Sequence, residues 1–135
     1  MKTQSFVSIT LVVLVLSVFI SCSEQKKEQQ LTVLAWNVWH AGHSKAYGQQ
    51  ACDGTIGILK KSQADVILMV ETYGAAPMIA DSLGYDYYLI SSNLCIFSRY
   101  PIIKKYTFPD VIDTFNFGGV EIDMDGTPVR LFDTW

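Results

Sequence analysis

The sequence is poor in positive charge. Ten Lys and Arg residues stand against 13 Asp and Glu residues, which gives a formal net charge of −3 over 135 residues. Residues 1–21 contribute only Lys2 to this sum, so the remainder has 9 basic and 13 acidic residues and a charge of −4. A chain without a basic stripe does not attract a polyanion through its own charge. If the ligand is a polyanion, we expect a divalent cation to supply the attraction.

Histidine and cysteine are also scarce, with two and three residues. His40, His43 and Cys52 lie close in sequence, but their spacing matches no strong zinc pattern and a fourth ligand is missing. The sequence therefore does not predict a zinc site.

The apolar run Phe6–Ile20 is too short to span a membrane and has the length of a signal-peptide core, about 15 residues. The residues Phe19-Ile20-Ser21-Cys22 resemble the lipobox of bacterial lipoproteins, which implies cleavage before Cys22 and acylation of its thiol. An ordinary signal with an incidental cysteine is the alternative. We expect a signal peptide over 1–21, a polar tether over 22–30, a domain over 31–135, and anchoring in the bacterial cell envelope, at the outer membrane or cell surface.

Cys52 and Cys95 are the two remaining cysteines. Export would permit a disulfide between them, but the sequence does not show that their Cα atoms approach each other. Two buried thiols are an equally good interpretation.

The segment Leu31–His40 is typical of a β-strand. Both of its alternating faces are mostly apolar, which predicts a strand buried on both sides. Asn37 is the first polar side chain after the apolar residues 33–36, where a rigid scaffold meets a loop. Asn37 either serves the chemistry of the protein or only ends the strand and begins a turn.

A second buried strand, Val66–Val70, ends in Glu71, and the helical pattern of residues 51–62 separates the two strands. A strand–helix–strand unit places its strands parallel, so Asn37 and Glu71 are expected at the same edge of the sheet. Carboxylate and amide oxygens suit magnesium. The alternative for Glu71 is an acid that merely leaves the core.

The rest of the chain predicts a short helix and several strands. The helix covers residues 76–83 and ends at Gly84, a typical C-cap. Strands are expected over 85–90, 94–97, 102–108, 119–124 and 128–135. Asp125-Gly126 predicts a tight hairpin, and an antiparallel meander is expected from residue 85 onward.

Five motifs in this order resemble the exonuclease–endonuclease–phosphatase family of metal-dependent phosphoesterases. They are Trp36-Asn37, Asp65–Thr72, Gly84-Tyr85, Ile96–Ile102 and Val129–Trp135. The resemblance covers residues 31–135. It implies an α/β (α+β) fold, the amino-terminal half of a DNase I-like two-sheet β-sandwich flanked by helices.

The resemblance also implies roles for individual residues. Glu71 matches the family's magnesium-binding glutamate, and Asn37 matches the asparagine that helps to hold the metal and the scissile phosphate. Ser98 and Arg99 match a motif of structural support. The implied cofactor is Mg²⁺ or Mn²⁺, and the implied substrate is a phosphoester: nucleic acid, sugar or inositol phosphate, or a lipid headgroup. No protein partner is predicted.

The chain departs from the family pattern in two respects. Asp133-Thr134-Trp135 stands where the family has Asn-Thr-His, and no part of the chain matches the family's Asp-x-Asn and Ser-Asp-His segments, of which the latter activates water. We therefore expect an amino-terminal fragment that is inactive alone.

Two other interpretations remain. The first is a non-catalytic surface lipoprotein that uses the sandwich as a binding module. The second treats residues 31–90 as a flavodoxin-like sheet, but the hairpin signal and the lack of a Gly-rich phosphate loop count against it.

Overall fold

The computed structural model describes residues 28–40, 48–108 and 116–135. Contacts within the chain divide it into two units, Met1–Gln30 and Leu31–Trp135. The expected signal peptide, Cys22 and His43 lie outside the described residues. Among the described residues, the helices are too short or too polar to cross a membrane.

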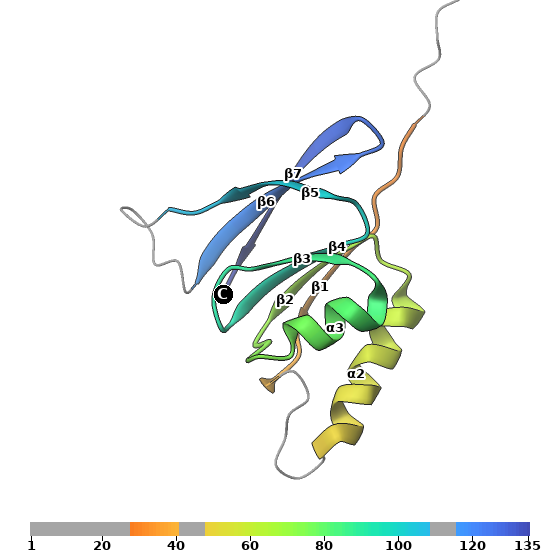
Figure 1. Ribbon diagram of the computed structural model, residues 1–135, viewed down its shortest axis with the longest axis vertical. Coiled ribbons are helices and arrows are strands. Elements are labelled where there is room, and N and C mark those ends of the chain that lie inside the picture. The colour runs from red at the N-terminus through yellow and green to blue at the C-terminus, as the bar shows by residue number, and fades with distance from the viewer. Residues whose placement is uncertain (1–27, 41–47, 109–115) are drawn as a thin grey trace, which may run out of the picture. The chain divides into compact units, whose positions relative to one another are not determined.

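The first sheet has four strands in the order β1-β2-β4-β3 (Figure 1). β1 (Val33–Asn37) and β2 (Val66–Val70) are parallel, and α2 (Gly48–Ser62) connects them. β4 (Leu94–Ser98) is antiparallel to β2, and β3 (Asp86–Leu89) is antiparallel to β4. The predicted strand–helix–strand unit is therefore confirmed.

The second sheet contains β5 (Ile102–Tyr106), β6 (Phe117–Met124) and β7 (Thr127–Thr134), all antiparallel. The turn between β6 and β7 has φ of 51° at Asp125 and 86° at Gly126, as a type I′ hairpin requires. The prediction of one meander from residue 85 is wrong. β3 and β4 join the first sheet, because β4 pairs with β2, and only the last three strands form the antiparallel meander.

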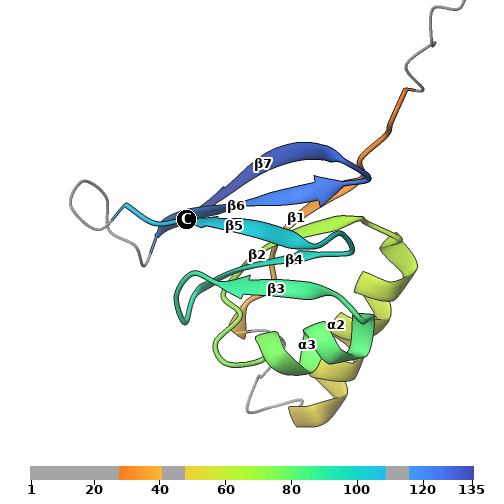
Figure 2. The same cartoon turned by 45° about the horizontal axis from the view of Figure 1, so that its top comes forward.

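The second sheet, the first sheet and the two helices lie in successive layers (Figure 2). Among the described residues, two apolar cores hold these layers together. Between the two sheets, the buried residues are Val66, Ile96, Val120 and Ile122. On the other face of the first sheet, α2 and α3 (Ala76–Leu83) pack through a larger cluster that includes Leu59, Ile79 and Met69. β2 and β4 are covered on both faces, because the helices pack on one face of their sheet and the second sheet packs on the other. This confirms the predicted burial of Val66–Val70.

The predicted burial of the first strand on both faces is wrong. β1 alternates between exposed and half-buried residues, and Val33 is 43% exposed. Among the strands that the structure describes, β1 lies at the edge of the sheet and pairs with β2 alone, so its apolar side chains have fewer neighbours than those of β2.

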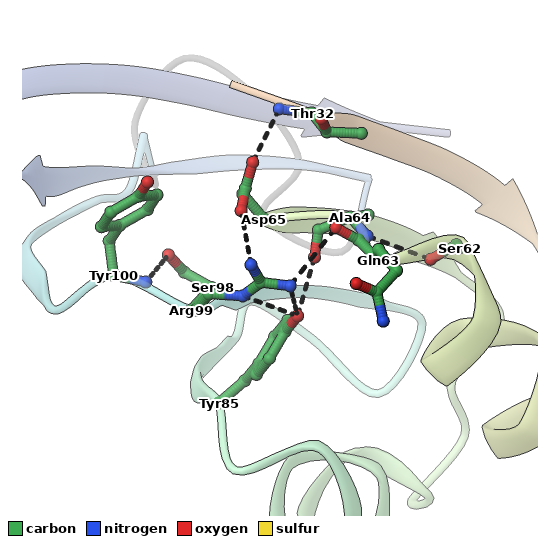
Figure 3. A network of polar contacts seen from close by, with 9 residues as sticks. All are labelled: Thr32, Ser62, Gln63, Ala64, Asp65, Tyr85, Ser98, Arg99 and Tyr100. Atoms are coloured by element: carbon green, nitrogen blue, oxygen red, sulfur yellow. Dashed lines mark hydrogen bonds and ion pairs between the residues drawn. The ribbon is translucent and has the colours of Figure 1, made fainter. Parts of the chain in front are cut away.

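An arginine bridge closes the end of the sheet where β1 and β2 begin (Figure 3). Arg99 Nη1 lies 3.1 Å from Asp65 Oδ1, and its Nε and Nη2 donate to Tyr85 Oη at 3.2 and 3.0 Å. Asp65 Oδ2 in turn accepts the backbone N–H of Thr32 at 2.9 Å. The structural role expected for Arg99 matches this geometry, and the bridge lies at the opposite end of the strands from Asn37 and Glu71.

No disulfide joins Cys52 and Cys95, and both cysteines are buried. Of the two interpretations left open by the sequence, the structure therefore selects buried thiols.

Candidate metal and phosphate site

The side chains of Asn37 and Glu71 are in contact. Asn37 is the last residue of β1 and Glu71 directly follows β2, and the parallel register pairs Asn37 with Val70. Asn37 Nδ2 donates a hydrogen bond of 3.2 Å to Glu71 Oε1. The structure therefore brings the two predicted site residues together at the edge where the parallel strands end.

The turn after β1 also binds these two side chains. Asn37 Oδ1 accepts the backbone N–H of Trp39 at 3.1 Å, and Glu71 Oε2 accepts that of His40 at 3.1 Å. Trp39 and His40 have φ of 37° and 56°, in the left-handed region. Asn37 therefore begins a turn, as the plainer interpretation expected, while it also orients the carboxylate of Glu71.

The pair presents three side-chain oxygens at this edge. Asn37 Oδ1 and Glu71 Oε2 each accept a backbone N–H, and Glu71 Oε1 accepts the Asn37 amide. Each carbonyl or carboxylate oxygen keeps a second lone pair. Magnesium commonly takes one or two protein oxygens and completes its octahedron with water and substrate phosphate. The donor set of Asn37 and Glu71 fits that pattern. Among the described residues no group of three or more His, Cys, Asp or Glu side chains gathers.

The backbone of Glu71 is held in an unusual conformation, with φ of 66°. Its N–H donates to Asn93 Oδ1 at 3.1 Å. The N–H of Thr72 donates to the backbone oxygen of Asn93 at 3.1 Å, and the N–H of Tyr73 donates to that of Ser92 at 2.8 Å. Three successive amides after β2 are thus fixed to the turn that precedes β4, and this fixes the direction of the Glu71 carboxylate.

Asn93 was missed by the sequence analysis, which treated residues 91–93 only as a turn. Its side chain is fully buried, and its Nδ2 has no hydrogen-bond partner among the described residues. The one available signal was a polar amide directly before a buried apolar strand. Its importance depends on the pairing of Val70 with Leu94, which places residue 93 beside residue 71.

Asp133, near the end of β7, and Trp135, which follows β7, differ in their surroundings. Asp133 is 6% exposed, and burial raises the pKa of its carboxyl group from 3.8 to about 6. Asp133 Oδ1 accepts the N–H of Thr134 at 3.0 Å, whereas Oδ2 has no hydrogen-bond partner among the described residues. Burial, and secondarily the charge of Asp133, raises the pKa of the Cys95 thiol. Trp135 is 61% exposed.

Solved structures with the same fold were found, although no family model and no curated protein sequence matches this chain. TDP2 from Caenorhabditis elegans matches 87% of the chain with a TM-score of 0.65 and 17% identity. A humanized D. rerio TDP2 matches 76% with a TM-score of 0.59 and 18% identity. An endonuclease/exonuclease/phosphatase family protein from Leptotrichia buccalis matches 78% with a TM-score of 0.54 and 17% identity.

These likenesses show the fold, that of a partial DNase I-like sandwich. The chain spans 38%, 45% and 55% of the lengths of these three proteins.

Proposed function

We propose that this chain, which has the DNase I-like fold of the exonuclease–endonuclease–phosphatase proteins, forms the metal-binding half of a phosphoesterase. The observation that carries the proposal is the 3.2 Å contact between Asn37 Nδ2 and Glu71 Oε1 at the edge where β1 and β2 end. Glu71 and Asn37 are the proposed catalytic and metal-binding residues, and Mg²⁺ or Mn²⁺ is the proposed cofactor.

The bound ion would polarise a phosphoryl oxygen and stabilise the negative charge that develops on it. The chain's own residues position the side chains that would bind this ion. Glu71 supplies the carboxylate, Asn37 orients that carboxylate through its amide, and the N–H of His40 fixes the second oxygen. Asn93 holds the backbone from which the carboxylate projects.

A general base is not identified among the described residues. The ring of His40 stacks on Tyr73 at 4.9 Å between centroids, and no carboxylate within the described part of the chain orients it. In the family resemblance, the water-activating aspartate and histidine belong to segments that none of these 135 residues match. We therefore expect residues 22–135 alone to show no metal-dependent turnover.

The proposal leaves the phosphoester open among nucleic acid, sugar or inositol phosphate and lipid headgroup. We further propose that acylated Cys22 anchors the protein in the bacterial cell envelope, at the outer membrane or cell surface. Replacement of Cys22 with alanine should then release the protein from the membrane fraction, and retention of the variant would contradict the anchor.

The proposal is tested by measuring phosphoester hydrolysis. The polypeptide used contains residues 31–135 followed by Asp-x-Asn and Ser-Asp-His segments. We expect Mg²⁺-dependent hydrolysis of bis(p-nitrophenyl) phosphate, and we expect Glu71→Gln to lower the rate by about a hundredfold or more. Asp81→Asn removes the same charge from an exposed position on α3 and should leave the rate unchanged. Equal rates for Glu71→Gln and the parent would remove Glu71 from the site.

A non-catalytic binding module is the second candidate. The observation that favours it is the exposed Trp135 at the position of the family histidine. This candidate predicts that phosphoesters bind to the joined polypeptide without being hydrolysed.

A further inference from the structure

Three aromatic rings form a cluster beside the Asn37–Glu71 pair. The rings of His40 and Tyr73 are stacked, with centroids 4.9 Å apart and planes 29° apart. The ring of Trp39 meets His40 edge-on at 5.9 Å. The rim cluster, as we call Trp39, His40 and Tyr73, is attached directly to the candidate site, because the N–H groups of Trp39 and His40 donate to its two side chains.

The rim cluster is exposed and strained. Trp39 is 69% exposed and Tyr73 is 39% exposed, so these rings contribute little to either apolar core. All three residues have a positive φ, which residues other than glycine rarely adopt: 37° for Trp39, 56° for His40 and 36° for Tyr73. Such backbone strain costs about 1–3 kcal/mol per residue and concentrates at functional sites. Packing in an apolar core therefore does not explain the position of these rings at this edge of the sheet.

The surroundings of the rim cluster show what kind of ligand it suits. Residues 31–40, 71–75 and 91–94 contain no Lys or Arg, so these segments do not recognise a phosphate through cationic side chains. The side chains beside the rings, Asn37 and Glu71, are polar, whereas an acyl chain is held by a continuous apolar groove. Exposed aromatic faces instead stack on flat π-systems, at about 1–3 kcal/mol per nucleobase.

We propose that the rim cluster stacks on a planar aromatic ring of the substrate, such as a nucleobase, while Asn37 and Glu71 hold the adjoining phosphate through the metal ion. This inference rests on the proposed function and narrows its substrate class. Trp39 and Tyr73 are specificity-determining residues in this account.

Phenyl phosphate and cyclohexyl phosphate test the proposal, because they share a phosphate and a six-membered ring but only the first ring is flat and aromatic. Binding to the full chain in the presence of Mn²⁺ is measured by calorimetry. We expect phenyl phosphate to bind at least about fivefold more tightly, the equivalent of one weak stacking contact. Trp39→Ala and Tyr73→Ala should each reduce this preference and leave the affinity for inorganic phosphate unchanged.

Tyr87→Ala is the matched control. Tyr87 has the same exposed fraction as Tyr73, 39%, but lies on β3 and stacks on Phe97. Its replacement should preserve the preference for phenyl phosphate. Equal affinities for the two phosphates in the parent chain, or equal losses from Tyr73→Ala and Tyr87→Ala, would overturn the proposal.

Adenosine separates this inference from the proposed function, because it carries a base and no phosphate. If the chain binds neither Mn²⁺ nor inorganic phosphate, the proposed function fails. Adenosine binding still tests whether the rim cluster stacks on an aromatic ring. Adenosine should shift the nuclear magnetic resonances of Trp39 and Tyr73 and spare those of Tyr87. Absence of these shifts at millimolar adenosine would overturn the stacking proposal.

Discussion

Replacement of Asn93 with alanine is expected to loosen the backbone of Glu71 specifically. The change removes the Oδ1 atom that accepts the Glu71 N–H at 3.1 Å, and it leaves that donor partly buried without a partner. An unsatisfied buried donor costs about 1–3 kcal/mol. The lost Nδ2 group has no hydrogen-bond partner among the described residues, so its removal offsets part of this cost. We therefore expect a net loss of about 1–2 kcal/mol.

Amide hydrogen exchange measures this effect residue by residue. The N–H of Glu71 should exchange about tenfold faster in Asn93→Ala, because 1.4 kcal/mol corresponds to a factor of ten. The amides of Thr72 and Tyr73 are internal controls, since they donate to backbone oxygens of Asn93 and Ser92 that the substitution preserves. Ser92→Ala is the control variant, because the exposed Ser92 contributes its backbone oxygen to this network.

Equal acceleration at residues 71, 72 and 73 would refute the reasoning. It would mean that the whole turn before β4 had unfolded and that the Asn93 side chain has no specific role toward Glu71. Unchanged exchange at Glu71 would refute it as well, because the hydrogen bond from Glu71 to Asn93 would then contribute nothing.

Three further predictions concern stability and are checked by urea denaturation. The pKa of Asp133 is about 6 in the folded chain against an ordinary 3.8, so the folded state binds more protons between these values and stability falls as the pH rises from about 4 to 6. Asp133→Asn should abolish this fall and stabilise the chain above pH 6 by up to about 3 kcal/mol; a variant no more stable at pH 7.5 than the parent would contradict the assignment. Arg99→Ala removes an ion pair and hydrogen bonds and should destabilise the chain by about 1–2 kcal/mol. These interactions lie at the opposite end of the strands from Glu71, so the affinity for Mn²⁺ should not change. Weaker Mn²⁺ binding by Arg99→Ala would contradict this separation. Gly119→Ala should destabilise by about 1–3 kcal/mol, because an added Cβ would lie 2.6 Å from the backbone oxygen of Leu131 and would also collide with the ring of Phe132. Gly57→Ala in α2 has open space and should stabilise by up to about 1 kcal/mol.

The amino-terminal half of the domain was the more predictable part. Alternation, a helical stripe and a second apolar run were enough to predict β1, α2 and β2, and the parallel pairing then placed Asn37 and Glu71 together. The helix over Ala76–Leu83 was predicted with its bounds, since Gly84 adopts φ of 68° at the C-cap. These features depend on local sequence patterns and on the rule that a strand–helix–strand connection places its two strands parallel.

The features that were missed depend on contacts between distant segments. β4 and the later strands show similar apolar patterns, and the sequence does not tell which of them pairs with β2. Without that pairing, Asn93 is one turn residue among several. The exposure of β1 was missed for a related reason, because an apolar edge strand and an apolar central strand have the same pattern of residues.

The central claim is that the amide oxygen of Asn37 and the carboxylate of Glu71 hold one divalent ion. Titration of the full chain with Mn²⁺ in the presence of inorganic phosphate, followed by electron paramagnetic resonance, tests it most directly. The account predicts one bound ion, an affinity about tenfold or more weaker in Glu71→Gln, and an unchanged affinity in Asp81→Asn. An ion bound equally well by the parent and by Glu71→Gln, or no bound ion at all, would contradict it.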